Sequence, residues 1–154
     1  MGSVVKRFWV PTSLTSQTVC FLQRTRDFFT LLNRVPHLTT WLKVYDVQDS
    51  GRKIRNERVF FDGGKDIMDG MLCDIDGNLW CGWGMGLLDL DGVMVISPKG
   101  KLIGRIAVPE RCANLCFGGR MRNRLFMAAS HSIYSLYVKY ARCFRGVVDP
   151  WSST

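Results

Sequence analysis

The sequence predicts an all-β fold, an incomplete (partial) β-propeller of two to three blades with an irregular N-terminal region. Three observations support this prediction. Short β-rich runs alternate with turn signals from residue 42 onward, one motif recurs at the spacing of a propeller blade, and residues 1–41 differ in composition from the rest. Hydrophobic residues make up 47% of the 154 residues and charged residues 22%, as in globular proteins.

The N-terminal region, residues 1–41, contains one Gly, one Asp and no Glu, whereas residues 42–154 contain the other fourteen Gly and twelve acidic residues. Its apolar residues show only a weak periodicity. The segment from Asp27 to Val35, which ends before Pro36, is compatible with a short amphipathic helix. We otherwise predict irregular structure for residues 1–41.

The part from residue 42 to residue 138 shows short strands at a spacing of roughly 8–12 residues, which is typical of an all-β meander. Turns with Asp-Gly or Lys-Gly separate several of them, because Gly accepts the positive φ of tight hairpins. No strand is predicted in the tail, residues 139–154. The predicted strands are Leu42–Val47, Arg58–Phe61, Gly70–Ile75, Asn78–Gly82, Gly92–Ser97, Lys101–Val108, Asn114–Phe117, Arg124–Ala128 and Ser132–Val138.

An internal repeat organises these strands. The motif that begins at Asp69 and continues to Leu79 and Trp80 is echoed by one that begins at Asn114 and continues to Leu125. Asp69 and Asn114 lie 45 positions apart, and a period of about 40–45 residues with four strands is that of a propeller blade. We therefore expect both residues at the start of inner strands, facing the central axis of successive blades.

Composition also limits the partners. The net charge is +8, but no Lys/Arg stripe with interleaved aromatics, zinc-finger spacing or Gly-rich RNA-binding signature accompanies it, so we predict no nucleic-acid partner. No apolar run approaches the roughly 20 residues of a membrane span, and the N-terminus has no signal-peptide core, so we predict a cytoplasmic chain without a membrane partner. We expect reduced thiols at Cys20, Cys73, Cys81, Cys112, Cys116 and Cys143.

Four ordered motifs carry a resemblance to a known family. They are KVYDVQDSGRKIRNERVF, MDGMLCDIDGNLWCGWG, GVMVISPKGKLIGRIAVPERCANLCFGG and RLFMAASHSIYSLYV. From about Leu42 to about Val138 the chain resembles the C-terminal part of the gluconolactonase and regucalcin-like (senescence-marker-protein-type) lactonase family. The resemblance implies a six-bladed propeller that hydrolyses a sugar lactone with a divalent metal ion, most often Ca²⁺, with Zn²⁺, Mn²⁺ or Mg²⁺ as alternatives.

The resemblance assigns roles to two residues. It implies that Asp69 is a metal ligand and the catalytic base, although Met68 stands where the family has Pro. A carboxylate of this kind suits a hard cation and can accept a proton from water. The other interpretation of Asp69 is a turn-capping residue before Gly70. Asn114 is the weaker candidate, as a substrate-binding residue or as an inner-strand Asn that satisfies backbone groups.

Other polar and aromatic residues have simpler explanations. The segment from Asp89 to Gly92 begins like a calcium loop but lacks its remaining acids, so it is a hairpin turn. Cys112 and Cys116 are explained by alternate strand positions, and no readable motif places an acid beside His131. Trp80 and Trp83 are expected to be core and rim aromatics.

Several parts of a complete enzyme have no counterpart in this sequence. Six blades need about 240–270 residues, and the family's metal-binding Glu and Asn-Gly-Leu motif are not found. We therefore expect lactonase activity to be impaired. The alternative is a non-catalytic propeller fragment or interaction module that self-associates through its open sheet edges.

A shift of reading frame would explain the N-terminal region. One choice of codons for residues 27–41, read in a shifted frame, encodes Leu-Leu-Tyr-Val-Val-Glu-Ser-Arg, which is similar to the family's strand before KVYDV. Residues 17–20 can be encoded so that the same frame contains Asn-Gly-Leu. The hypothesis is that residues 18–41 are translated out of the family's frame.

Overall fold

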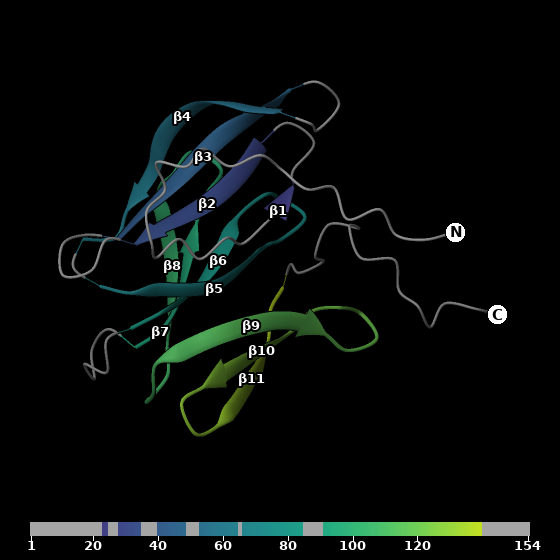
Figure 1. The fold of residues 1–154 in the computed structure, drawn as a ribbon. Helices are drawn as coiled ribbons and strands as arrows, with labels where there is room; N and C mark the ends of the chain where they lie inside the picture. The colour runs from purple at the N-terminus through teal and green to yellow at the C-terminus, as the bar shows by residue number, and fades with distance from the viewer. Residues whose placement is uncertain are drawn as a thin grey trace, which may run out of the picture. The chain divides into compact units, whose positions relative to one another are not determined.

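A computed structural model of the protein describes residues 23–24, 28–34, 40–48, 53–64, 66–84 and 91–139. Every secondary-structure element in these ranges is a β-strand, and the strands form three sheets (Figure 1). The chain divides between Met68 and Asp69 into two compact units. The predicted all-β class is confirmed. Within the described ranges, no helix has the length and apolar character needed to cross a membrane.

The first unit contains a four-stranded antiparallel sheet. Its strands follow one another in space as in sequence, and the predicted strands Leu42–Val47 and Arg58–Phe61 lie inside the third and fourth. The strands are β1 (Gln23–Arg24), β2 (Phe28–Arg34), β3 (Thr40–Gln48) and β4 (Lys53–Asp62).

Strand β2 corrects the prediction for the N-terminal region. The helix expected from Asp27 to Val35 is wrong, because Phe28–Arg34 is a strand that pairs with β3 from Phe28 opposite Asp46 to Arg34 opposite Thr40. A short apolar segment is compatible with either structure, and the long-range partner decides between them. The predicted irregular structure therefore does not hold for these residues, and residues 1–22 lie outside the described ranges. The frame hypothesis itself is tested by the nucleotide sequence across codons 15–42, where the shifted frame must encode Asn-Gly-Leu.

Polar side chains join β3 to β4 across the first sheet. Glu57 accepts hydrogen bonds from the Tyr45 hydroxyl at 2.6 Å and from the Lys43 ammonium. The hydrogen bond from Lys43, followed by that from Tyr45, lowers the pKa of Glu57. Asp46 pairs with Arg58 at 2.8 Å on the same two strands. These contacts fix the register of a strand pair that contains two irregularities.

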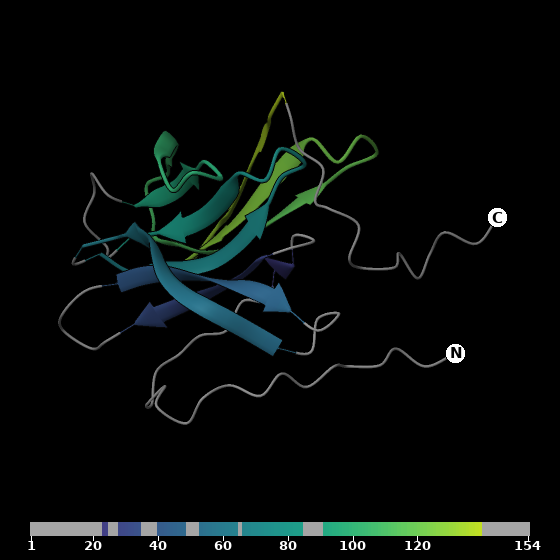
Figure 2. The same cartoon turned by 90° about the horizontal axis from the view of Figure 1, so that it is seen from above.

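The second unit contains two further sheets, and both are twisted (Figure 2). One has the order β5-β6-β7-β8 and the other the order β11-β10-β9. A four-stranded antiparallel meander is the unit of a propeller blade, so the described sheets correspond to two blades and three strands of another. The strands are β5 (Met68–Cys73), β6 (Leu79–Trp83), β7 (Gly92–Ile96), β8 (Leu102–Ala107), β9 (Cys112–Gly118), β10 (Arg124–Ala129) and β11 (Ile133–Tyr137).

Asp74 organises the turn between β5 and β6, and this residue is only 2% exposed. Its carboxylate accepts hydrogen bonds from the backbone N–H of Asp76 at 3.0 Å and of Asn78 at 2.8 Å. It also accepts one from Asn78 Nδ2 and one from Trp80 Nε1, both at 2.9 Å. Gly77 takes a φ of 80°, as the Asp-Gly signal predicts. The predicted tight turn is therefore present.

An apolar core joins the two sheets of the second unit. Its residues come from the inward faces of β5, β7, β9 and β10 and from Val108. Trp80 packs edge-on against Phe117 at a ring-centroid distance of 5.4 Å, as expected for a core aromatic. The buried cluster is Leu72, Val93, Val108, Cys112, Leu115, Phe117, Leu125 and Met127. Strand β6 packs against β9, and β5 approaches β9 where Gly70 meets Asn114.

Candidate functional site

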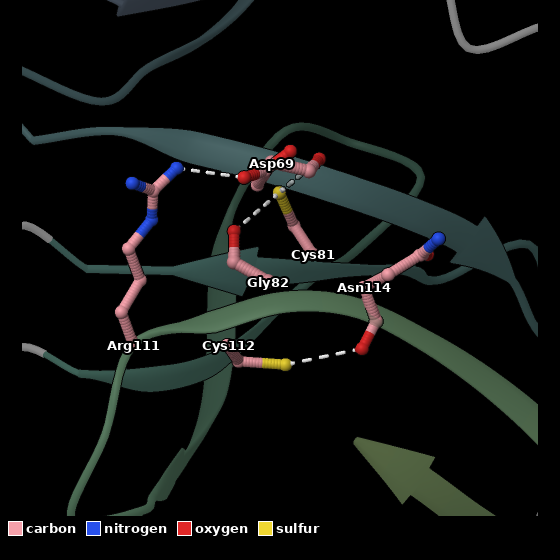
Figure 3. A network of polar contacts seen from close by, with 6 residues as sticks. All are labelled: Asp69, Cys81, Gly82, Arg111, Cys112 and Asn114. Atoms are coloured by element: carbon pink, nitrogen blue, oxygen red, sulfur yellow. Dashed lines mark hydrogen bonds and ion pairs between the residues drawn. The ribbon is translucent and has the colours of Figure 1, made fainter. Parts of the chain in front are cut away.

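Asp69 is the second residue of β5, and its carboxylate is paired with Arg111 (Figure 3). Arg111 Nη2 donates to Asp69 Oδ2 at 2.7 Å. Arg111 directly precedes β9, so the pair joins the first strands of two successive sheets. The Asp69 side chain is 29% exposed and that of Arg111 is 35% exposed, which leaves the ion pair accessible to water.

Asn114, the other predicted site residue, lies on β9 beside the backbone of β5. A Cβ atom placed on Gly70 would lie 2.3 Å from Asn114 Oδ1 and 2.8 Å from Asn114 Cα. Real Cβ atoms do not approach other heavy atoms so closely, so only Gly fits at position 70. The structure therefore brings the two residues predicted from the repeat to one place, through the neighbour of Asp69.

The side chains of Asp69 and Asn114 nevertheless point in different directions. Figure 3 shows the Asp69 carboxylate directed toward Arg111, whereas the Asn114 amide does not point toward that carboxylate. Asn114 Oδ1 accepts the backbone N–H of Leu115 at 2.8 Å. This contact matches the interpretation of Asn114 as an inner-strand residue that satisfies a backbone group.

A β-bulge in the third sheet contributes to this arrangement. The register shifts so that Cys112 pairs with Ala129 and Asn114 with the adjacent Ala128. Bulges of this kind turn the side chains that follow them. Cys112 is buried and Cys116 is exposed. Simple alternation along a strand would have put Cys112 and Cys116 on the same face. The prediction that alternate strand positions explain the two cysteines is therefore wrong.

Two buried thiols lie behind the site. Cys81 donates to the backbone carbonyls of Gly82 at 3.3 Å and Asp69 at 3.8 Å, and Cys112 donates to that of Asn114 at 3.3 Å. Burial raises the pKa of Cys81 to about 12 and that of Cys112 to about 11, and the nearby charge of Asp69 also raises both. Both thiols are neutral at pH 7 and unsuited to nucleophilic attack. Within the described ranges Cys81, Cys112 and Cys116 form no disulfide.

A second polar cluster surrounds Glu110, the neighbour of Arg111. Glu110 accepts hydrogen bonds from the Ser132 and Tyr134 hydroxyls, each at 2.8 Å, and from the His131 backbone N–H at 2.6 Å. These bonds, Ser132 first, lower the pKa of Glu110 to about 2. The structure thus places an acid beside His131 that no local motif indicates. The cluster ties the β10–β11 turn to the segment that leads into β9.

The predicted calcium-like loop lies partly outside the described ranges, which exclude Asp89. Asp91 is buried directly before β7, and a Cβ on Gly84 would lie 2.0 Å from its carboxylate. Its backbone carbonyl accepts the Val108 N–H at 3.2 Å. These contacts place Asp91 in the packing between strands.

The oxygen donors at the site do not by themselves fit a divalent cation. Ca²⁺ takes about six to eight oxygen ligands, several of them from protein. Near Asp69 the donors are one carboxylate held by Arg111 and one amide oxygen held by the Leu115 N–H. The described ranges contain no group of three His, Cys, Asp or Glu side chains that could hold a metal ion. A tight site would need further ligands.

Sequence reasoning missed Arg111, Gly70 and Glu110 as parts of this region. The sequence shows Gly70 as part of the repeated motif, but it does not show that Asn114 lies against this glycine. Arg111 and Asp69 are 42 positions apart, and no periodicity links them. The packing of the β5–β8 sheet against β9 brings these residues together.

The chain also matches the sequence model of a known protein family. A sequence model described as the SMP-30/gluconolactonase/LRE-like region matches residues 14–131. This match begins at residue 14, whereas the resemblance found in the sequence begins only at about Leu42. The curated proteins include no significant match to the chain.

Solved structures give the same result at the level of the fold. A putative gluconolactonase is 25% identical, with a TM-score of 0.63 over 74% of this chain and 36% of its own. A gluconolactonase from Xanthomonas campestris is 21% identical, with a TM-score of 0.56 over 72% of this chain and 34% of its own. A calcium-binding regucalcin from Agrobacterium tumefaciens is 23% identical, with a TM-score of 0.56 over 69% of this chain and 35% of its own. The matched region is thus about a third of each of these proteins.

Proposed function

The chain belongs to the SMP-30/gluconolactonase/LRE-like family, and from this we propose that it carries part of a sugar-lactone hydrolase site centred on Asp69. The observation that supports the proposal is the position of Asp69. It lies on the first strand of a blade-like sheet, is partly exposed, and is adjacent to the contact between Gly70 and Asn114.

Hydrolysis of a lactone opens a cyclic ester. Water attacks the carbonyl carbon, the ring C–O bond breaks, and the product is a hydroxy acid. In the proposed function the Asp69 carboxylate accepts a proton from the attacking water and returns it to the ring oxygen as the C–O bond breaks. The Asn114 amide contacts a hydroxyl of the sugar. Arg111 donates to Oδ2 of this carboxylate, so the proposal assigns the proton to Oδ1.

The proposed activity is impaired in the isolated chain. The chain matches about a third of the length of the solved relatives, and Asp69 is the single member of the implied Glu, Asn and Asp ligand set found in it. Ca²⁺ bound by one carboxylate and water is held weakly compared with a site of several protein oxygens. We therefore expect slow hydrolysis with a weak dependence on Ca²⁺.

A second candidate is a non-catalytic propeller fragment or interaction module. The ion pair between Asp69 and Arg111 favours it, because a carboxylate engaged in this way has a structural role without any ligand. The two candidates predict different rates of lactone hydrolysis when the Asp69 side chain is removed.

The test is hydrolysis of gluconolactone, followed as acid release in a pH-stat with and without Ca²⁺. We expect a rate above the spontaneous one for the wild-type chain and a loss of roughly 10²–10⁴-fold in Asp69→Ala, since a general base contributes this much. Asp76→Ala, which removes an exposed carboxylate of the same unit, is the control and should retain the rate. Equal rates for the two variants would contradict the role of Asp69, and no hydrolysis by the wild-type chain would support the second candidate.

A further inference from the structure

Asp69 already has a cationic partner in the structure. The Arg111 guanidinium donates to its carboxylate at 2.7 Å, and both side chains are about one-third exposed. A carboxylate has a single negative charge, which the guanidinium neutralises at this distance. Any divalent cation that approaches Asp69 therefore meets a positive charge at the same carboxylate.

The backbone of Arg111 is anchored on both sides. Glu110 accepts two hydrogen bonds from the β10–β11 turn and one from Tyr134 on β11, and Cys112 is fully buried in the core of the second unit. The Arg111 Nε atom is buried and has no hydrogen-bond partner within the described ranges. The hydrogen bond that the structure gives the guanidinium is the one to Asp69 (Figure 3). Arg111 is thus held where its charge acts on Asp69.

We propose that Arg111 acts as a resident cation that competes with a divalent metal ion for Asp69. The inference rests on the proposed role of Asp69 as a metal ligand. A metal ion can bind this carboxylate only by displacing the guanidinium or by remaining close to it, and like charges at this separation repel. Arg111 is therefore a positioning residue that lowers the cation affinity of the site.

The proposal predicts that removal of the charge strengthens metal binding. The affinity of Arg111→Gln for Mn²⁺ should exceed that of the wild-type chain by about tenfold, since one nearby positive charge has been removed from a partly exposed site. Arg111→Lys, which keeps the charge, should remain close to wild type. Asp69→Asn combined with Arg111→Gln should lose the gain, because the carboxylate is absent.

The experiment is a titration of the full chain with Mn²⁺ followed by electron paramagnetic resonance, with Ca²⁺ as competitor. Mn²⁺ prefers the same oxygen ligands and can be detected when it binds weakly. Arg120→Gln is the matched control, since it removes an exposed positive charge from a turn of the same unit. Circular dichroism verifies that each variant is folded, and Arg111→Met replaces Arg111→Gln if the latter is not.

The outcomes separate this inference from the proposed function. A gain in Arg111→Gln that Arg120→Gln and Arg111→Lys do not show supports the inference. Binding that is equal in the wild-type chain and in Arg111→Gln, and lost in Asp69→Asn, overturns it while leaving Asp69 as a ligand. Absence of binding in the folded Arg111→Gln and Arg111→Met variants overturns both the inference and the metal-binding role of Asp69.

Discussion

Asp69 and Gly70 are adjacent residues with different surroundings. Asp69 is paired with a charged side chain, that of Arg111. Gly70 must have no side chain because Asn114 occupies the space. The repeat in the sequence placed Asp69 and Asn114 at matching positions, and the contact through Gly70 explains why the pair of blades can come so close. The geometry of the candidate site thus depends on a residue without functional atoms.

Gly70→Ala tests this contact. The new Cβ would lie 2.8 Å from a backbone atom of Asn114, which cannot move without shifting β9, so we expect a loss of about 1–3 kcal/mol in the free energy of unfolding. Gly104→Ala is the control, because a Cβ there would lie 3.7 Å from Val95 and should change stability by less than about 0.5 kcal/mol. Urea denaturation measures both. Equal stability of the two variants would contradict the close approach.

Glu110 gives the second prediction at the scale of a residue. Its pKa falls from 4.5 to about 2 in the folded chain, chiefly through the hydrogen bond from Ser132. A carboxyl group with a lowered folded-state pKa stabilises the fold above its unfolded-state pKa, and this stabilisation is lost as pH falls toward 2. Glu110→Gln should therefore reduce stability at pH 7 and weaken its decline between pH 4.5 and pH 2.

The measurement is the free energy of unfolding as a function of pH for the wild-type chain and the variant. Asp76→Asn removes an exposed carboxylate of the same unit and serves as the control. Asp46 and Glu57 also have lowered pKa values, so the wild-type profile contains their contributions too. The difference between wild type and Glu110→Gln isolates Glu110, and parallel pH profiles for the two would show that Glu110 does not contribute.

At the scale of the element, hairpin turns and strands follow different rules. The β5–β6 turn is specified locally, because Asp74, Gly77 and Asn78 lie within five positions and satisfy one another. Strand β2 is specified by its partner, since its seven residues pair with β3 and local spacing suggested a helix. Each of the nine strands predicted from residue 42 onward overlaps an observed strand, whereas β1 and β2 were not predicted.

Asp74→Ala tests the local rule. The substitution leaves two backbone N–H groups, the Asn78 amide and the Trp80 indole N–H without their acceptor, so we expect a loss of about 2–4 kcal/mol in the free energy of unfolding. Asp74→Asn keeps one acceptor oxygen and should lose roughly half as much. Asp76→Ala, in the same turn but exposed, should remain within about 0.5 kcal/mol of wild type. Thermal unfolding that ranks the three variants otherwise would contradict this account of the turn.

At the scale of the whole molecule, β11 is the last strand of the three-stranded sheet β11-β10-β9. Within the described ranges β11 pairs with β10 alone. Two large side chains on β11 are exposed, with Ile133 at 76% and Tyr137 at 72%. An edge strand with exposed apolar residues is a template for pairing with a further strand. These features favour self-association through the open sheet edge, which the sequence also suggested.

Ile133→Lys tests self-association at this edge. We expect the sedimentation coefficient of the wild-type chain to rise with concentration and that of Ile133→Lys to remain near the monomer value, because a charge on an edge strand opposes pairing. Met121→Lys is the matched control, since Met121 is 63% exposed in a turn outside the strands and the charge change is the same. A wild-type chain that stays monomeric at all concentrations would contradict the prediction.

The sequence by itself determined the all-β class, the hairpin turns, the blade period and the matching positions of Asp69 and Asn114. These features are local or periodic, so a single chain shows them as patterns of Gly, Asp and apolar residues. Tertiary structure alone decided that Phe28–Arg34 is a strand, that Gly70 lies against Asn114, and that Arg111 holds the Asp69 carboxylate. Each of these depends on a partner outside the local sequence pattern. Contacts between strands are set by register and by packing of the core, and no sequence period encodes which charges they bring together.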